Sequence, residues 1–328
     1  MSRCILEAMC RSGTDWVWND ELNAICGQNV STAHLMISCG VFVSNSSESR
    51  SSSSGVSIKG DYTRYNILMD SNTAARLIEL NRDFYTRFGD SFSATRHRIQ
   101  PGVRRVLEML KGDESILDLG CGNGEVAREL AKRGHRGPYL GLDFSLPLLR
   151  VADSPPVGTA QLDGFSARFL QVDLTQLSIF SGQLSGIGNW SLITAFAVLH
   201  HIPSYELRLN ILRNVRRLLK DNGRFIHSNW QFLNSEKLKA RIQPWEAATI
   251  SSSDVEAGDH LLDWRSGGEG LRYVHHFNEQ ELSELAEASS FHISDSFYSD
   301  GEGGRLGWYQ VWRPVLDEKC KNKSTNRV

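Results

Sequence analysis

The stretch ESILDLGCGNGE, residues 114–125, decides the fold of this chain. Its apolar run at 115–119 has β-branched character and predicts a buried strand. Three glycines then recur at every second position, at Gly120, Gly122 and Gly124. A helical pattern follows over 125–133, and its N-terminus offers unpaired N–H groups. Because glycine permits a sharp turn and the close approach of a ligand, this strand–loop–helix unit predicts a nucleotide-like cofactor.

An acidic residue stands at the end of each of the next two predicted strands. The run 138–144 contains Asp143 near its end, and the run 167–174 contains Asp173. An acid at the end of the second strand of a βαβ unit is placed to accept hydrogen bonds from ribose hydroxyls. Asp173 is then a natural partner for the exocyclic amine of an adenine. The spacing G-x-G-x-G is neither a phosphate-binding P-loop nor a full dinucleotide fingerprint, which disfavours the alternative of an NAD domain.

The glycine loop and the two acids together resemble the class I S-adenosylmethionine-dependent methyltransferases. Their pattern is D-x-G-x-G-x-G followed by an acid closing the second strand and another closing the third, and this chain reads DLGCGNGE from Asp118. The resemblance implies S-adenosyl-L-methionine as the cofactor. It also implies an α/β fold with a Rossmann-like seven-stranded sheet, mostly parallel with the last strand antiparallel, and helices on both faces. The implied cofactor-binding residues are Asp118, Gly120, Cys121, Gly122, Asn123, Gly124, Asp143, Phe144, Asp173, Leu174 and Ala197. Cys121 is interpreted as a small spacer in the loop rather than a nucleophile.

Composition narrows the class of protein without naming it. The 328 residues carry a formal net charge of −2, which gives no whole-chain footprint for nucleic acid. The six cysteines show no C-x-x-C pair or metal-ligand spacing, so no metal site is predicted and a reducing compartment is favoured. No run approaches the roughly 18–20 apolar residues of a membrane helix. We therefore expect a cytoplasmic protein, with the nucleus as a second location, and no membrane partner.

The chain divides into regions of different composition. Residues 1–60 form a low-complexity leader whose stretch 44–57 holds nine serines, so we expect it to be disordered. The methyltransferase-like domain is expected over 72–314. Within it, 231–277 shows little regular pattern and is interpreted as an insertion on the substrate side. Residues 315–328 form a charged tail.

Hydrophobic periodicity places the remaining elements of the domain. Helices are predicted over 72–88, 101–110, 204–220 and 278–290. Strands are predicted over 190–202, 224–230, 291–297 and 308–312. The sequence Asp-Asn-Gly at 221–223 is expected to end the third of these helices.

Motifs outside the cofactor half resemble one methyltransferase group more closely. AVLHH at 197–201, Trp230, RYVHHF at 272–277 and FSATR at 92–96 are similar to motifs of the tRNA wobble-uridine carboxymethyl methyltransferases. One departure is Val274, where that family has a tyrosine. The resemblance implies methylation of the carboxymethyl group on a modified wobble uridine, with tRNA as the partner. It also implies a small zinc-binding activator subunit near the fourth strand.

Candidate catalytic residues follow from the chemistry of a carboxylate acceptor. A carboxylate is already ionised at neutral pH, so methyl transfer requires alignment more than a strong base. Arg272 could hold it through paired N–H bonds, with His275 or Tyr273 as a second donor. His200 or His201 could line the channel for methyl transfer. The alternatives are that Arg272 is a surface ion-pair partner and that His200 only packs at the cofactor edge.

Basic residues cluster on both sides of the proposed mouth, and their attraction to phosphates should weaken with salt. They are Arg96, His97, Arg98, Arg104 and Arg105 on one side and Lys237, Lys239 and Arg241 on the other. Two further readings stay open. One is a small-molecule O- or N-methyltransferase, with 231–277 as a lid. The other is a non-catalytic cofactor-binding subunit that docks to a partner.

Overall fold

The structure is a computed structural model that describes residues 69–94, 98–153, 165–177 and 189–316, without the side chains of 90–94. These residues belong to one compact unit. The leader at 1–60 and most of the charged tail lie outside the described residues, so what we expect of them stays a prediction. The same holds for the side chains of the FSATR motif.

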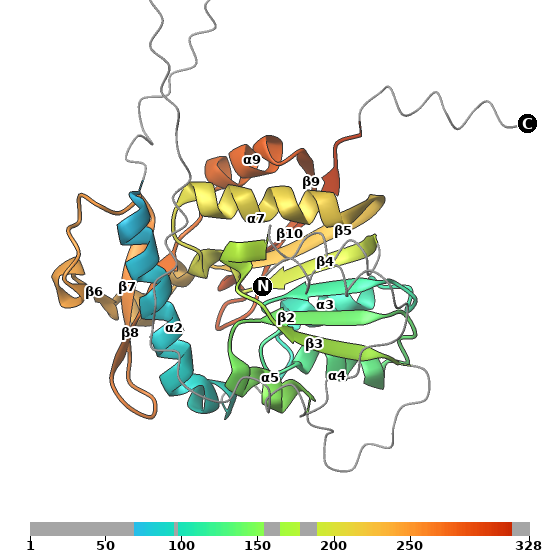
Figure 1. The fold of residues 1–328 in the computed structure, drawn as a ribbon, viewed down its shortest axis with the longest axis horizontal. Helices are drawn as coiled ribbons and strands as arrows, with labels where there is room; N and C mark the ends of the chain where they lie inside the picture. The colour runs from blue at the N-terminus through green and yellow to red at the C-terminus, as the bar shows by residue number, and fades with distance from the viewer. Residues whose placement is uncertain (1–68, 95–97, 154–164, 178–188, 317–328) are drawn as a thin grey trace, which may run out of the picture. The chain divides into compact units, whose positions relative to one another are not determined.

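A seven-stranded sheet organises the described chain (Figure 1). Its order is β3-β2-β1-β4-β5-β10-β9, and β10 is antiparallel to both of its neighbours while the other pairs are parallel. The strands are β1 (Ile116–Leu119), β2 (Tyr139–Asp143), β3 (Ala167–Gln171), β4 (Trp190–Phe196), β5 (Leu219–Trp230), β9 (Phe291–Ser299) and β10 (Gly307–Pro314). The strand order reverses between β1 and β4, which is where open α/β sheets bind ligands. The predicted sheet is confirmed.

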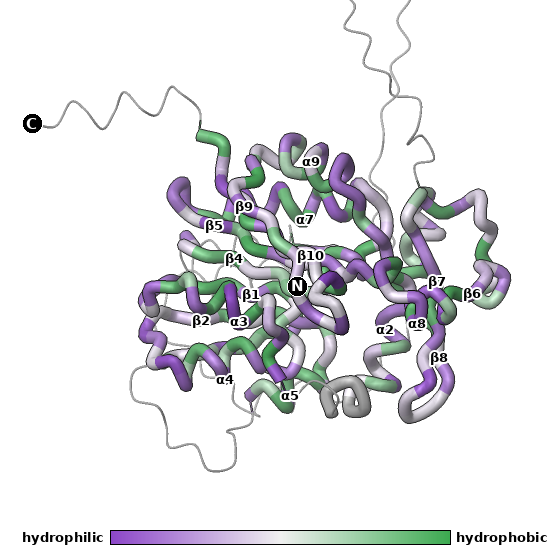
Figure 2. Tube along the Cα trace, turned by 180° about the vertical axis from the view of Figure 1, so that it is seen from behind, coloured by the Kyte–Doolittle hydropathy of each residue, from purple (hydrophilic) through white to green (hydrophobic). Residues whose placement is uncertain are grey.

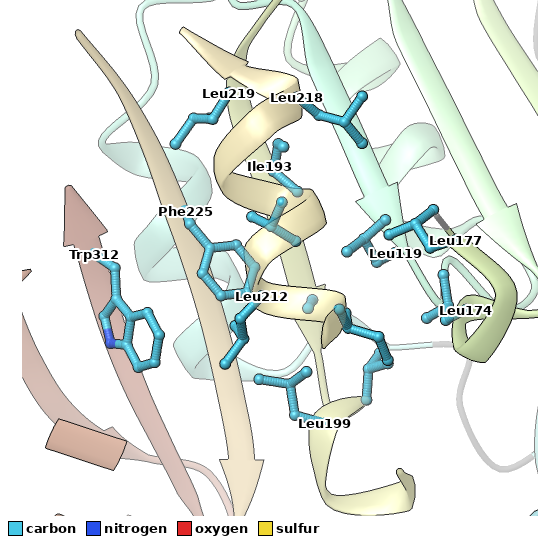
Figure 3. Close-up of a cluster of buried hydrophobic side chains, with 14 of the residues drawn as sticks. Leu119, Leu174, Leu177, Ile193, Leu199, Leu212, Leu218, Leu219, Phe225 and Trp312 are labelled. Atoms are coloured by element: carbon cyan, nitrogen blue, oxygen red, sulfur yellow. The ribbon is translucent and has the colours of Figure 1, made fainter. Parts of the chain in front are cut away.

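Helices cover both faces of this sheet, as predicted (Figure 1). Those on one face are α3 (Pro101–Glu108) and α4 (Glu125–Lys132), and those on the other are α7 (Tyr205–Leu218) and α9 (Glu279–Ala288). The helix α5 (Leu146–Asp153) follows β2. Apolar residues of α7 recur three or four positions apart and pack with strand residues into the larger core cluster. Figure 3 shows this packing, with Leu212 of α7 close to Phe225 of β5 and Ile193 of β4.

Hydropathy along the chain follows this layering. Figure 2 shows hydrophilic and hydrophobic segments alternating along α4 and α9, as expected for helices with one buried face. Among the helices that the structure describes, none combines the length and the apolarity needed to cross a membrane.

Several predicted boundaries differ from the structure. The helix predicted over 72–88 extends to Ala94. The strand predicted over 167–174 ends at Gln171, so Asp173 lies two residues beyond β3 and caps the 3-10 turn η2 (Leu174–Gln176).

Two further errors have a local cause. The strand predicted over 190–202 ends at Phe196, because Ala197 has a φ of +57° and the chain then forms the 3-10 turn η3 (Leu199–His201). The third helix ends at Leu218 rather than at 221–223. Leu219 is already extended and pairs with Trp190, so the Asp-Asn-Gly sequence lies inside β5.

The segment 231–277 is more regular than the sequence suggested. It contains a short helix, α8 (Glu236–Lys239), and an antiparallel sheet of β6 (Ile242–Gln243), β7 (Asp259–Trp264) and β8 (Gly270–His275). The long helix α2 (Ser71–Ala94) packs along β8 (Figure 1). Polar residues such as Asp259 and Arg272 are buried in these strands, so the alternation of apolar and polar residues that marks a strand is obscured.

Candidate functional site

A cavity of about 230 Å³ lies at the carboxyl ends of β1, β2 and β4. Ten of the eleven residues predicted to bind the cofactor line it, namely Asp118, Gly120, Cys121, Gly122, Asn123, Asp143, Phe144, Asp173, Leu174 and Ala197. The exception is Gly124, which caps α4 in a left-handed conformation and packs so tightly that an added Cβ would lie 2.9 Å from Ala152 Cβ. The structure therefore gives Gly124 a packing role.

Two buried acids lie at the cavity wall, and one of them, Asp143, holds the glycine loop. Asp143 accepts hydrogen bonds from the backbone N–H groups of Gly122 and Ser145, both at 2.8 Å. Burial raises the pKa of Asp143. Asp118 accepts from Tyr139 Oη at 2.6 Å and from Thr194 Oγ1 at 2.7 Å. Burial raises the pKa of Asp118 to about 6, against the opposing effect of these two hydrogen bonds. Both carboxylates are thus held in single orientations at the cavity wall.

Cys121 is 8% exposed and lies in the glycine loop, where the charges of both acids act on it. Burial, together with the negative charges of Asp118 and Asp143, raises the pKa of its thiol far above the ordinary range. A thiol that stays protonated at neutral pH is a poor nucleophile. This favours the interpretation of Cys121 as a small spacer.

One wall of the cavity comes from α2, which the sequence reading treated only as a packing helix. Ile78, Asn81, Arg82 and Tyr85 line the cavity from this helix. Arg82 Nη2 donates to Asp173 Oδ2 at 2.9 Å, while Asp173 Oδ1 caps the next turn through Thr175. These four residues follow the spacing i, i+3, i+4, i+7 and therefore share one face of the helix. That spacing is the sequence signal that could have identified them as lining residues.

A second cavity of about 320 Å³ adjoins the first. His200, Trp230 and Arg272 line it, from η3, β5 and β8 respectively. Tyr85 and His201 line both cavities, so the two spaces share a wall at the end of β4. The arrangement places a substrate-sized space directly beside the space expected to hold the cofactor.

Arg272 is a buried cation enclosed by aromatic rings. Its side chain belongs to a residue only 5% exposed, which rules out the alternative of a surface ion pair. The guanidinium carbon lies 4.7 Å from the ring centroid of Trp230 and 5.6 Å from those of Phe84 and Trp264. Guanidinium groups stack well on aromatic faces, so this cation is held in place before any ligand arrives.

His200 is buried at the same cavity. Its Nδ1 accepts a hydrogen bond from the backbone N–H of Trp230 at 3.3 Å, and its ring centroid lies 4.3 Å from that of His201. The ring therefore links η3 to the end of β5. This position agrees with both readings of His200, a lining residue and a packing residue.

Tyr273 and His275 are not at the cavity, and the roles predicted for them are revised. Neither lines either cavity, and both are at most 1% exposed. Along a strand alternate side chains point to opposite faces, so these two point away from the side that carries Arg272. The hydroxyl of Tyr273 donates to Asp259 Oδ1 at 2.7 Å, and His275 lies 2.6 Å from the same atom.

Comparison with known proteins assigns this architecture to a family. A family model described as a methyltransferase domain matches residues 92–294. The chain belongs to this methyltransferase family. A solved S-adenosylmethionine-dependent methyltransferase from Methanosarcina mazei superimposes with a TM-score of 0.51 at 24% identity, covering 67% of this chain and 99% of that one. With the sheet order and the glycine loop, the chain is a class I S-adenosylmethionine-dependent methyltransferase.

Two curated relatives of this methyltransferase extend the comparison. A protein of Encephalitozoon cuniculi named as a methyltransferase is 30% identical over 214 residues, which are 65% of this chain and 87% of that protein. The mouse tRNA (carboxymethyluridine(34)-5-O)-methyltransferase is 26% identical over 147 residues. These residues are 44% of this chain and 19% of the mouse enzyme, so the match spans a small part of the longer protein.

A buried charged network supports the second sheet of the methyltransferase. Arg208 of α7, 1% exposed, contacts Glu256 at 2.6 Å and Glu281 at 3.1 Å. His275 bridges Asp259 at 2.6 Å and Glu281 at 2.8 Å. Glu256, Asp259 and His275 come within the spacing of metal ligands, but Arg208 already supplies a positive charge there. We assign the network to joining α7, α9 and the second sheet.

The network predicts a pH dependence of stability. Burial and Arg208 lower the pKa of His275, but hydrogen bonds to Asp259 and Glu281 outweigh them and hold that pKa above its usual 6.5. A group whose pKa is raised by folding contributes stability that is complete below the unfolded pKa and is lost as pH rises through the folded pKa.

We therefore expect the melting temperature to fall as pH rises above about 6.5 and His275 loses its proton. A His275→Gln variant should be less stable at the lower pH and should show a flatter slope over this range. Thermal unfolding followed by circular dichroism measures both, with exposed His292→Gln as the matched control. Parallel slopes in wild type and His275→Gln would contradict the assignment.

Proposed function

We propose that this methyltransferase transfers a methyl group from S-adenosylmethionine to the carboxymethyl group of a modified wobble uridine in tRNA. The single observation that carries the proposal is the buried, aromatic-enclosed Arg272 at a cavity adjoining the expected cofactor cavity. The similarity to the mouse carboxymethyluridine enzyme supports the same acceptor. The proposal includes tRNA as the ligand and a small zinc-binding activator subunit as a partner. It also includes a location in the cytoplasm, with the nucleus as a second location.

The first cavity fits S-adenosylmethionine, which supplies an electrophilic methyl group on a positively charged sulfur. Asp143 would hold the ribose hydroxyls, since it closes β2 at the cavity wall. Asp173 would contact the adenine amine beside Arg82. Gly122 faces open space in the cavity, so backbone atoms of the loop can approach the ligand closely.

Gly122→Ala tests this cradle. Gly122 has a φ of +55°, so alanine should lower the free energy of unfolding by about 1–2 kcal/mol. Its methyl group would also project into the cavity and should weaken S-adenosylmethionine binding several-fold by calorimetry. Gly112→Ala is the matched control, because Gly112 also has a positive φ and open space but lies outside both cavities. Equal cofactor affinity in the two variants would contradict the cradle.

The second cavity fits a carboxylate acceptor. A carboxylate needs no general base, so the protein has only to neutralise and orient it. The planar guanidinium of Arg272 can do this with two parallel N–H bonds. Trp230 lies at the same cavity and is partly exposed, which leaves aromatic surface beside the cation.

The basic residues predicted for RNA binding differ in their exposure and in their partners. Arg98 is exposed and lines the second cavity. Arg105 stacks over Phe297 at 4.0 Å, and Arg241 pairs with Asp263 at 2.8 Å. Lys239 pairs with Glu236 at 2.6 Å. Arg96 and His97 lie outside the described residues. Arg104 and Lys237 are exposed but line neither cavity, so Arg98 is the best-placed group for a phosphate among the described residues of this set.

A matched pair of tRNA substrates tests the proposed acceptor. Labelled methyl from S-adenosylmethionine should be transferred to tRNA that carries carboxymethyluridine at the wobble position, and not to the same tRNA with unmodified uridine. The product should lose its label under mild alkali, because a methyl ester hydrolyses readily. The assay is run with and without a small zinc-binding activator subunit. Transfer to both tRNAs, or an alkali-stable product, would refute a carboxymethyl acceptor and favour a different O- or N-acceptor.

A further inference from the structure

Asp300 lines the second cavity, which is the acceptor cavity of the proposed function, and that function gives it no role. It directly follows β9, is partly exposed, and has a left-handed φ of +70°, which aspartate tolerates. The other acid at this cavity, Glu125, pairs with Arg128 at 2.8 Å. An acid such as Asp300 is unexpected in a space that receives a carboxylate, because like charges repel each other.

Two neutral donors hold the carboxylate of Asp300. The backbone N–H of Gly102 donates to Oδ1 at 2.8 Å, and the hydroxyl of Tyr309 donates to Oδ2 at 2.6 Å. Burial and the charge of Asp300 raise the pKa of Tyr309, so this hydroxyl keeps its hydrogen. A carboxylate offers about four lone-pair positions and no hydrogen. Each oxygen of Asp300 can therefore accept one further hydrogen bond and can donate none.

The carboxylate lies beside Trp230, which lines the same cavity. Trp230 and Gly307 are directly paired across β5 and β10, so both residues present the same face of the sheet. A Cβ added at Gly307 would lie 2.5 Å from Asp300 Oδ2, so the missing side chain makes room for the carboxylate on that face. The guanidinium carbon of Arg272 lies 4.7 Å from the ring centroid of Trp230. The acceptor cavity therefore holds an anion and a cation beside the same aromatic residue.

We propose that Oδ2 of Asp300 selects the acceptor by accepting a hydrogen bond from a ring N–H group, which in carboxymethyluridine is N3–H. The inference rests on the proposed function, because it concerns the acceptor named there. The carboxylate of this acceptor would be attracted by Arg272 and repelled by Asp300, so the two charges together determine which way round it binds. Asp300 receives no proton and takes no part in the transfer of the methyl group. It is a specificity-determining residue.

A matched pair of RNA substrates tests this selection. Both are tRNA with carboxymethyluridine at the wobble position, and in one of them a methyl group replaces the hydrogen on N3. With the activator subunit supplied, the wild type should use the N3-methylated tRNA about 10- to 100-fold less efficiently by kcat/KM, because a hydrogen bond to a charged group is lost. Equal efficiency on the two tRNAs would overturn the proposal.

The Asp300→Asn variant separates the hydrogen bond from the bulk of the added methyl group. Asparagine has the same shape and also tolerates a positive φ, so the variant should fold and bind S-adenosylmethionine within about twofold of wild type. Because the N–H of Gly102 only donates, the amide oxygen should take the Oδ1 position and the amide nitrogen the Oδ2 position. Two donors would then face each other when N3–H is present, so the variant should discriminate between the tRNAs by less than about threefold.

Asp295→Asn changes an exposed acid on β9 and is the matched control, which should keep the wild-type ratio. Thermal unfolding shows that the variants are folded. A folded Asp300→Asn variant with the wild-type ratio would overturn the role of Asp300, because the bulk of the methyl group would then explain the discrimination. Transfer to neither tRNA by the wild type would instead refute the proposed acceptor, so the two failures are distinguishable.

Discussion

Replacing Arg272 by alanine is expected to slow methyl transfer to carboxymethyluridine tRNA by about 30- to 1000-fold, while S-adenosylmethionine binding stays nearly unchanged. The guanidinium is buried against Trp230, Phe84 and Trp264, so a carboxylate bound there would lose a desolvated, paired contact worth about 2–4 kcal/mol. The effect should fall on the rate rather than on cofactor affinity, because Arg272 lines only the acceptor cavity.

Two further variants separate charge from geometry. Arg272→Lys keeps the positive charge but not the planar fork or the stacking on aromatic rings, so it should recover little activity. Arg313→Ala removes an exposed arginine on β10 and serves as the matched control. Single-turnover rates, with cofactor affinity measured in parallel, provide the readout. An Arg272→Ala enzyme as fast as the wild type would refute the proposed grip on the acceptor.

Asp143→Ala is expected to weaken S-adenosylmethionine binding by about tenfold or more. The ribose hydroxyls would lose a charged acceptor worth about 1.5–3 kcal/mol. The structure adds a second cause, because Asp143 also fixes the N–H groups of Gly122 and Ser145 at 2.8 Å. Without it the glycine loop would lose one of its anchors.

The control for Asp143→Ala is Asp295→Ala, which removes an exposed acid on β9. Calorimetry gives the affinity, and thermal unfolding shows whether the variant is folded. Unchanged affinity in a folded Asp143→Ala variant would contradict the assignment of the ribose site.

The cofactor half was predictable because its signals are local in the sequence. Each βα unit places a short apolar run directly before its functional residue, so Asp118, Asp143 and the glycine loop could be located without knowledge of long-range contacts. All of these residues lie at one sheet edge, as parallel strands require. The seven-stranded sheet with its antiparallel last strand followed from the resemblance rather than from periodicity, and the order of the strands was seen only in the structure.

The acceptor half depended on contacts between distant parts of the chain. Four charged or titratable residues of the buried network gave no sign of burial in the sequence. They can lie in the core because they pair with one another, and they are Arg208, Glu256, His275 and Glu281. Tyr85 reaches the junction of the two cavities because α2 packs on β8, and its partner His201 is 116 residues away. No local sequence pattern predicts a contact between residues so far apart in the chain. Arg272 and Tyr273 point to opposite faces because both lie on β8, and no strand was predicted there from the sequence.

The most direct test of the central claim is mass spectrometry of nucleosides from tRNA incubated with the full-length protein and S-adenosylmethionine bearing a labelled methyl group. The tRNA carries carboxymethyluridine at the wobble position, and an activator subunit is supplied. Our account predicts that carboxymethyluridine is converted to a species heavier by one labelled methyl group, with every other nucleoside unchanged. Unaltered carboxymethyluridine, or label on any other nucleoside, would contradict it.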